Sequence, residues 1–290
     1  MPIDFDFPAL KKLTPSIFDS GKSRWIKTPS VTSSGNIQRD RLRIATFNIW
    51  FGELHREARL KALLHLLQGH EPDLIGLEEV TPETLELIKA DPWVREHYVL
   101  SDITGETVNP YGIFLMSRIP VNRFGLYSLH SWMGRHVLIG EFTINGEDFH
   151  AGVVHLESYR SSAPERAIQL GDIFLILNRP PHSILMGDFN FCATWDENRV
   201  LDPGYQDLWG ALHPNEPGYT EDTDVNLMRW ELKREEKQVR FDRILLRSPA
   251  SRWHPRSIQI IGTEPISTEH PSVFPSDHFG LVGDIRWHHK

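Results

Sequence analysis

Short apolar runs, separated by polar and turn-forming residues, repeat along this chain from residue 41 onward. Runs of this length, bounded by turn signals, are typical of buried strands. The Asn145-Gly146 dipeptide between two of them predicts a tight hairpin turn. The predicted strands are residues 41–50, 73–80, 112–117, 137–144, 149–155, 183–186, 241–246 and 281–286.

Other segments show the period or the start signals of a helix. Residues 54–67 place leucines on one face, and Gly69 is expected to end this helix. Thr81-Pro82 supplies an N-cap threonine followed by proline at the first helical position. Pro164 opens a further helix that runs to about Leu177. The leucines on the face of the first helix are Leu60, Leu63, Leu64 and Leu67.

This order of elements predicts the fold class and the domain organisation. Strands that come in pairs with a few intervening helices indicate two packed sheets flanked by helices, an α/β (α+β) arrangement. Residues 1–40, with a loop composition over 28–36, are interpreted as an N-terminal extension without an independent domain. No internal linker follows, so residues 41–290 are expected to form a single catalytic domain.

Composition restricts the class of protein further. A hydrophobic fraction of 40% and a charged fraction of 24% are ordinary for a globular protein, and no apolar stretch approaches the roughly 18 residues that cross a bilayer. The N-terminus lacks the features of a secretory signal, and the single cysteine, Cys192, suits a reducing compartment. We therefore expect an intracellular protein of the nucleus or the cytoplasm that is not secreted, has no membrane partner and is monomeric.

Charge is unevenly distributed. The net charge of -8 argues against a broad, non-specific grip on nucleic acid. Residues 229–256 nevertheless carry nine Lys/Arg against four Asp/Glu, and residues 1–43 carry eight against four. Acidic residues are therefore concentrated in the middle of the chain, where a metal site would use some of them. A solvated face explains each basic run equally well.

Polar residues stand at the ends of the predicted strands, where a rigid scaffold can present side chains. Taken one at a time they have simple structural explanations, such as turn asparagines, a helix-proximal acid or a satisfied core histidine. Their recurrence at successive strand ends is harder to explain that way and indicates one active site. The residues are Asn48, Glu79, His155, Asp188, Asn190, Asp277 and His278.

These residue types match the requirements of phosphodiester hydrolysis. Magnesium prefers oxygen ligands, which Glu79 supplies with support from Asn48 and Asp277. Asp188 is a candidate base for the attacking water, and Asn190 is placed to hold that water or a phosphate oxygen.

Negative charge in the transition state also needs donors. His155 and His278 are the candidates, and Asp242 is a candidate partner that raises the pKa of such a histidine and fixes its tautomer.

The motifs around these residues resemble, in order, those of the endonuclease/exonuclease/phosphatase superfamily. The resemblance implies a four-layer αββα sandwich and dependence on Mg²⁺, with Mn²⁺ able to substitute. The family usually has glutamine where this chain has Glu78. The matching motifs are Thr46-Phe47-Asn48-Ile49, Leu77-Glu78-Glu79-Val80, His155-Leu156, Gly187-Asp188-Phe189-Asn190, Phe241-Asp242-Arg243-Ile244 and Ser276-Asp277-His278.

Residues 155–160, 218–226 and 274–281 resemble one branch of that superfamily, tyrosyl-DNA phosphodiesterase 2. The resemblance implies cleavage of the 5′-phosphotyrosyl bond between a trapped topoisomerase 2 tyrosine and a DNA 5′ end, leaving a 5′-phosphate. The implied substrate is single-stranded or frayed DNA with a covalent tyrosyl adduct. The implied catalytic and metal residues are those named above, with Ser158, Arg160, Arg135 and Trp50 as substrate contacts.

Several alternatives stay open. Arg160 also fits an ordinary helix-flanking charge, and Trp50 a core position. Glu221 stands where this branch often has an aromatic residue against DNA, which would lose a stacking contact and place acid near the phosphates. Other members of the superfamily, such as abasic-site or single-strand nucleases and inositol or sphingolipid phosphoesterases, remain alternatives. A binding module that kept the fold and lost activity is a further one.

Overall fold

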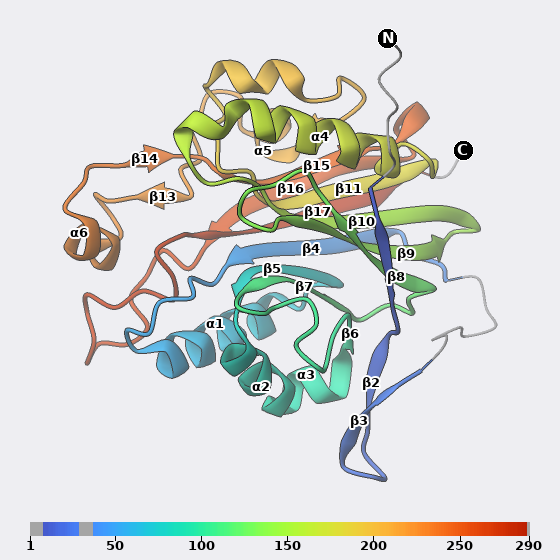
Figure 1. Ribbon diagram of the computed structural model, residues 1–290, viewed down its shortest axis with the longest axis horizontal. Helices are drawn as coiled ribbons and strands as arrows, with labels where there is room; N and C mark the ends of the chain where they lie inside the picture. The colour runs from blue at the N-terminus through green and yellow to red at the C-terminus, as the bar shows by residue number, and fades with distance from the viewer. Residues whose placement is uncertain (1–7, 29–36, 289–290) are drawn as a thin grey trace.

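The computed structural model describes residues 8–28 and 37–288, in which two β-sheets pack face to face (Figure 1). The strand order of the first sheet is β1-β8-β9-β10-β11-β15-β12. Its strands span, in that order, Leu10–Leu13, Arg123–Ser128, His136–Ile144, Glu147–His155, His182–Asp188, Asp242–Arg247 and Gln206–Asp207. The strand order of the second sheet is β16-β17-β4-β5-β7-β6-β2-β3. Its strands span Trp253–Ile261, Gly280–Trp287, Arg41–Asn48, Leu74–Val80, Gly112–Ser117, Val99–Leu100, Ser16–Asp19 and Arg24–Lys27.

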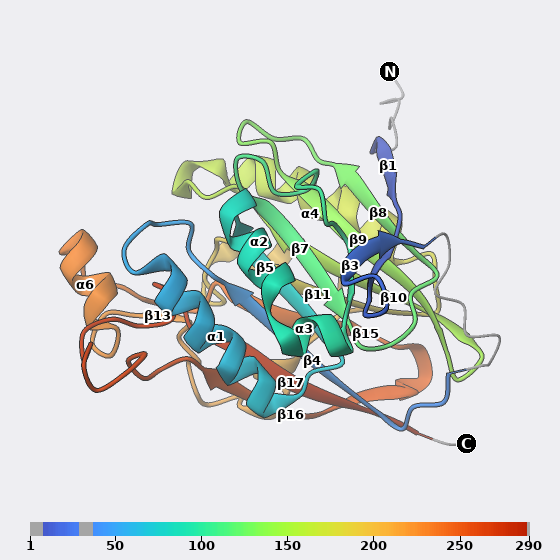
Figure 2. The same cartoon turned by 90° about the horizontal axis from the view of Figure 1, so that it is seen from below.

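Helices cover the outer faces of both sheets. Figure 2 shows α1, α2 and α3 lying across the second sheet, and α4 lies on the first sheet in Figure 1. A separate two-stranded ribbon, β13 and β14, projects with α6 from one end of the sheets. The helices are Arg56–His70 (α1), Pro82–Ala90 (α2), Pro92–His97 (α3), Ala163–Leu177 (α4), Leu208–Leu212 (α5) and Leu227–Lys233 (α6). The ribbon strands are Glu221–Asp222 (β13) and Gln238–Val239 (β14), and single 3₁₀ turns occupy Arg160–Ser162, Asp196–Val200 and Pro249–Ser251.

Three apolar layers hold these elements together. Between the sheets, Ile44 of the second sheet and Val153 and Met186 of the first belong to one buried apolar cluster. Leucines of α1 fill the layer between the helices and the second sheet, and Leu170 of α4 packs on the outer face of the first sheet. Strands buried on both faces read as continuous apolar runs, which is why the sequence predicts them. The predicted four-layer αββα sandwich is confirmed.

Two parallel strand pairs determine where the site lies. β4 pairs with β5, and β10 pairs with β11, each in parallel register. Parallel strands end at the same edge of a sheet, so the residues at their carboxyl ends lie side by side. This edge is the end of the sandwich from which β13, β14 and α6 project (Figure 1).

Most predicted element boundaries are confirmed within a few residues, with one clear exception. Thr81 caps α2 in a reciprocal capping box with Thr84, and Asn145 and Gly146 have positive φ as a tight hairpin turn requires. The predicted stop at Gly69 is wrong. α1 continues to His70 and ends where Glu71 turns left-handed, its N–H bonded to the last carbonyls of the helix.

No strand is predicted before residue 41, but three strands lie within residues 8–28. β1 pairs with β8 of the first sheet, whereas the β2–β3 hairpin joins the second sheet through β6. These strands are short, and β1 and the β2–β3 hairpin form the edges of their sheets, so they lack the apolar run of a buried strand. The predicted loop at 28–36 lies, from residue 29 onward, outside the described residues.

Strand β16 was also missed. It contains Pro255, which removes a backbone donor, and its register with β17 shifts between Pro255 and Ser257. An edge position in the sheet tolerates both features.

Within the described residues, no helix is long and apolar enough to cross a membrane.

Candidate functional site

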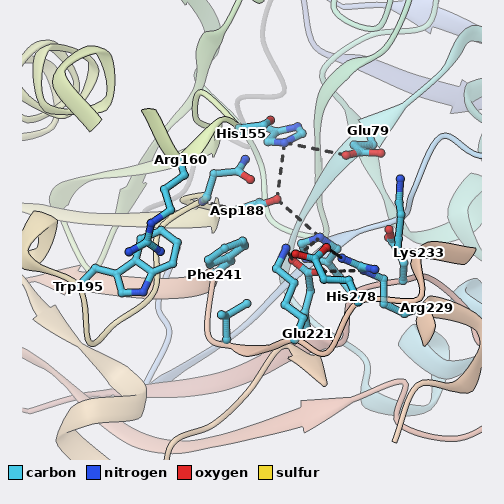
Figure 3. Close-up of a pocket in the computed structure, with 16 residues that line it drawn as sticks. Glu79, His155, Arg160, Asp188, Trp195, Glu221, Arg229, Lys233, Phe241 and His278 are labelled. Atoms are coloured by element: carbon cyan, nitrogen blue, oxygen red, sulfur yellow. Dashed lines mark hydrogen bonds and ion pairs between the residues drawn. The ribbon is translucent and has the colours of Figure 1, made fainter. Parts of the chain in front are cut away.

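The predicted site residues meet at the edge where the parallel strands end. In the strand registers, His155 pairs with Asp188, and Asp188 with Asp242. Asn48 ends β4, beside Glu78 of β5. The two sheets therefore bring their polar strand ends to one place. Figure 3 shows the resulting cluster, with Asp188 between the two histidines.

A bulge in β5 separates two adjacent glutamates. The register with β7 shifts between Leu77 and Val80, and Glu79 has φ 60, a left-handed conformation that costs energy for a residue with a side chain. As a result Glu78 is fully buried and accepts a hydrogen bond from Thr46 Oγ1 at 3.0 Å, whereas Glu79 lines the cavity of the site.

The turn after β11 fixes Asp188. Gly187 has φ 132, and a Cβ there would lie 2.0 Å from the carbonyl oxygen of Val154, so only glycine fits. Asn190 is left-handed as well, with φ 56. Its backbone N–H donates to Asp188 Oδ1 at 2.8 Å, and its side-chain Nδ2 donates to the carbonyl of Leu156 at 3.0 Å.

The other carboxylate oxygen of Asp188 is the centre of the cluster. Asn48 Nδ2 donates to Asp188 Oδ2 at 3.1 Å and to Glu79 Oε1 at 3.3 Å. His155 Nε2 lies 3.5 Å from the same Asp188 oxygen, and His278 Nε2 lies 3.9 Å from it. One carboxylate oxygen therefore faces an amide and two imidazoles.

His278 and Asp242 form a buried pair. His278 Nδ1 lies 2.9 Å from Asp242 Oδ2, and the backbone N–H of Asp242 donates to Thr220 Oγ1 at 3.1 Å. Burial raises the pKa of Asp242 to about 6, although its partner histidine acts in the opposite direction. Burial alone would lower the pKa of His278, but the surrounding carboxylates, led by Asp242, raise it well above its ordinary value.

His155 has a cationic neighbour instead. Arg135 donates to His155 Nδ1 at 3.2 Å and to Ser158 Oγ at 2.7 Å. Arg135 Nη2 also lies 3.4 Å from His155 Nε2, so the guanidinium approaches both ring nitrogens. Because a guanidinium only donates, the shorter contact favours Nδ1 as the acceptor and Nε2, which faces Asp188, as the protonated nitrogen. Burial and the Arg135 charge lower the pKa of His155 well below its ordinary value. The two histidines thus differ in charge preference.

Glu79 and Asp277 suit a divalent cation. Burial and the neighbouring Asp277 carboxylate raise the pKa of Glu79 to about 7, and burial also raises the pKa of Asp277. A cation would offset this repulsion, and the oxygen donors match magnesium. A second buried group, formed by Asp188, Asp242 and His278, could also hold a metal, because its ligand atoms lie within 4.8 Å of one another.

Two cavities meet at His155. The larger, of about 460 Å³, is lined by Asp188, Glu79, Asp277 and both histidines of the cluster, together with the cations Arg160, Arg229, Lys233 and Lys237. The smaller, of about 180 Å³, lies on the other side of His155 beside Arg135 and Tyr111. The Arg135 guanidinium is 5.6 Å from the centre of the Tyr111 ring. Tyr111 was missed because it stands in a loop without a strand-end pattern.

The structure places the predicted substrate contacts in different surroundings. Ser158 and Arg160 line the larger cavity, and Arg135 lies behind His155. Trp50 packs instead beneath Arg59, whose guanidinium is 4.5 Å from the ring centre. It also contacts an apolar cluster that includes Phe274.

Glu221 lines the cavity, yet it does not present a free charge to it. The side chain is 3% exposed and accepts from Arg229 Nε at 3.0 Å and from Lys237 Nζ at 2.6 Å. Its Oε1 also lies 3.6 Å from His278 Nε2. These cations offset the negative charge that Glu221 was expected to place near the phosphates.

Comparisons with known proteins agree with this geometry. Residues 45–278 match the Endonuclease/Exonuclease/phosphatase family. Tyrosyl-DNA phosphodiesterase 2 of Homo sapiens is 28% identical over 278 residues, covering 89% of this chain and 72% of the human protein. The Xenopus tropicalis protein of that name is 30% identical over 247 residues, covering 78% of this chain and 61% of the relative.

A solved structure matches the fold as well. The crystal structure of D. rerio TDP2 complexed with single strand DNA product has a TM-score of 0.73 and 26% sequence identity. The match covers 86% of this chain and 100% of that chain. The predicted resemblance is therefore confirmed, and this chain belongs to the endonuclease/exonuclease/phosphatase family, as a phosphoesterase related to tyrosyl-DNA phosphodiesterase 2 at modest identity.

Proposed function

We propose that this enzyme hydrolyses the 5′-phosphotyrosyl bond between a trapped topoisomerase 2 tyrosine and a DNA 5′ end, leaving a 5′-phosphate. The proposal rests on the junction of the two cavities at His155. The larger, cation-lined cavity suits a nucleic acid strand, whereas the smaller one offers Tyr111 and Arg135 to an aromatic leaving group. The relative solved with single strand DNA product supports this assignment of the larger cavity.

Glu79 and Asp277 would hold the magnesium ion, with Asn48 orienting Glu79 through its amide. Manganese has similar ligand requirements and would substitute. We favour this pair over the group of Asp188, Asp242 and His278 because magnesium prefers oxygen ligands and His278 already contacts Asp242. When bound, the ion polarises the phosphoryl oxygens and offsets the charge that develops on them.

Asp188 would deprotonate the attacking water. Its Oδ1 is held by the Asn190 N–H, and its Oδ2, which accepts from Asn48 and faces both histidines, would take the proton from the water. Asn190 and Asn48 would keep that water in line with the bond that breaks. Removal of a proton requires a carboxylate in a fixed position, and the hydrogen bonds of Asp188 provide that position.

The two histidines would bind the phosphoryl oxygens from opposite sides. His278, kept protonated by Asp242, would donate from Nε2, and His155 would donate its Nε2 proton as a neutral ring. Ser158 and Arg160 would contact the strand. The departing phenolate needs little help from an acid, since the pKa of tyrosine is about 10. The Arg135 charge would lie close to this phenolate and stabilise it.

A comparison of substrates tests the proposal. Oligonucleotides with 5′-phosphotyrosyl, 3′-phosphotyrosyl or internal abasic groups would be offered to the enzyme, alongside inositol and sphingolipid phosphoesters. We expect turnover of the first alone in magnesium. Preferential cleavage of the abasic strand or of a headgroup ester would instead assign the chain to another branch of the family. Absence of turnover of every ester, including a simple aryl phosphodiester, would indicate a binding protein.

A further inference from the structure

A row of cationic and aromatic side chains lines the larger cavity beyond the catalytic cluster (Figure 3). The Arg160 guanidinium lies 3.8 Å from the centre of the Trp195 ring. The ring centres of Trp195 and Phe241 are 5.6 Å apart, edge to face at 75°. The Lys237 ammonium lies 4.6 Å from the centre of the Phe241 ring. We call these four residues the cation–aromatic wall.

The Arg160 end of this wall is available to a ligand. Arg160 is exposed, and no carboxylate within residues 8–28 and 37–288 pairs with its guanidinium. Lys237, by contrast, is bound to Glu221 at 2.6 Å. Lys233 is a second exposed cation of the cavity, and across the described part of the chain no carboxylate pairs with it either. An anionic ligand would therefore find its free donors at Arg160 and Lys233.

The aromatic part of the wall is held rigidly. The backbone N–H of Trp195 donates to the carbonyl of Cys192 at 2.9 Å, and Asn198 Nδ2 donates to the Trp195 carbonyl at 2.6 Å. The ring packs against the apolar layer beneath α4. A fixed ring with a flat guanidinium on it offers a planar surface whose ordering costs little on binding.

We propose that the cation–aromatic wall binds one nucleotide of the single strand attached to the scissile phosphate, an inference that rests on the proposed function. The base stacks on the Arg160–Trp195 pair, and the edge of the guanidinium donates to an adjacent phosphate. Single-stranded nucleic acids bind where aromatic or guanidinium planes alternate with cations, because bases have π-faces and the backbone is anionic. A peptide on the tyrosine side has no regularly spaced anion to match these cations.

Binding of a product-like strand tests the wall without chemistry. The probe is a fluorescent 5′-phosphorylated oligothymidylate, measured by anisotropy with the full chain. Trp195→Leu should weaken binding about tenfold, which is the order of one lost base stack, and Trp195→Phe should weaken it less. Trp25→Leu, which replaces a half-buried tryptophan of β3 at the distant edge of the second sheet, is the matched control and should leave binding unchanged.

A double-mutant cycle, which combines the Trp195 substitution with changes in the DNA, separates base stacking from a merely structural role of Trp195. Single abasic sites are moved along the strand, and at one position the wild-type protein should lose affinity whereas Trp195→Leu loses none further. Losses that multiply at every position would overturn the wall. Arg160→Met should also lower the salt slope of binding by about 0.7, as expected for one lost phosphate contact on a single strand.

The two proposals fail in different ways. If the wild-type protein cleaves 5′-phosphotyrosyl DNA and Trp195→Leu binds DNA of every strand length as tightly as the wild type does, the role of the wall is overturned and the proposed function stays intact. Binding that depends on Trp195 in a protein that cleaves no phosphotyrosyl ester would support the wall and overturn the proposed function.

Discussion

At the scale of single residues, Asp188 is the group on which the chemistry should depend most. Its Oδ2 faces Asn48, His155 and His278, and its Oδ1 is held by the turn. Asp188→Asn removes the base but keeps the shape, so kcat should fall by roughly a thousandfold. The free energy of unfolding should hold or rise, since a buried negative charge is lost among other carboxylates. A normal rate in this variant would mean that another group activates the water.

The contact between Asp242 and His278 makes a second prediction. Asp242→Asn should behave like a milder His278→Ala, because each change weakens the same donor. The double variant should be no slower than His278→Ala alone. This is checked by kcat/KM for all four proteins with a 5′-phosphotyrosyl substrate. Single losses that multiply in full would show that the two residues act independently.

At the scale of secondary-structure elements, α1 holds the loops of the site through Arg59. This arginine is 1% exposed and donates to five backbone carbonyls, four in the loop after β4 and one at Pro275. The loops follow Asn48 and precede Asp277. One helix side chain therefore fixes the spacing between the segment that follows Asn48 and the segment that precedes Asp277.

Arg59→Met should leave these carbonyls without partners, lowering the free energy of unfolding by on the order of 3 kcal/mol. Urea denaturation measures the change. Lys61→Met, on the exposed side of the same helix, removes an ion pair with Glu57. It is the control and should cost less than about 1 kcal/mol. Equal losses in both variants would show that Arg59 contributes no more than an exposed helix charge.

Elements differ in how far the sequence predicts them. β7 was predicted at its observed bounds and β11 close to them because both are buried apolar runs. β1, the β2–β3 hairpin and β16 were not predicted, since they form sheet edges, which need no such run. β8 (Arg123–Ser128), which lies inside the first sheet between β1 and β9, was missed as well, because Gly125 interrupts its apolar run. The end of α1 was missed because the left-handed stop falls at Glu71, not at a glycine. The left-handed backbone conformation of this one residue ends the helix, although glycine is the residue that usually adopts it.

The same limit applies to the site. Asn48, Asp188 and Asp277 could be predicted because each ends or precedes an apolar strand. Trp195 and Tyr111 could not, because they stand in irregular segments that only tertiary packing brings to the cavity. The ion pairs of Glu221 could not be predicted from the sequence either, since the ribbon of β13 and β14 brings Arg229 and Lys237 to it. The sequence shows which residues are acidic, but it does not show which distant cations neutralise them in the folded protein.

At the scale of the whole molecule, removal of metal ions should abolish activity, and magnesium or manganese should restore it. Calcium should restore it poorly, because its larger and looser ligand shell displaces the water and the phosphate. Initial rates after chelation and addition of each ion test this. Thermal unfolding provides a second readout, since a bound ion that offsets the Glu79–Asp277 repulsion should raise Tm. Full turnover in excess chelator would exclude the proposed metal role.

The N-terminal strands have a consequence for solubility. β1 closes the edge of the first sheet at β8, and the β2–β3 hairpin closes the second at β6. A chain shortened to begin at residue 37 would leave both sheets with unpaired backbone donors and acceptors, which are templates for intermolecular pairing. We expect the shortened protein to self-associate as its concentration rises, seen as growing light scattering, while the full chain stays monodisperse. Residues 8–28 would then serve as a guard against aggregation.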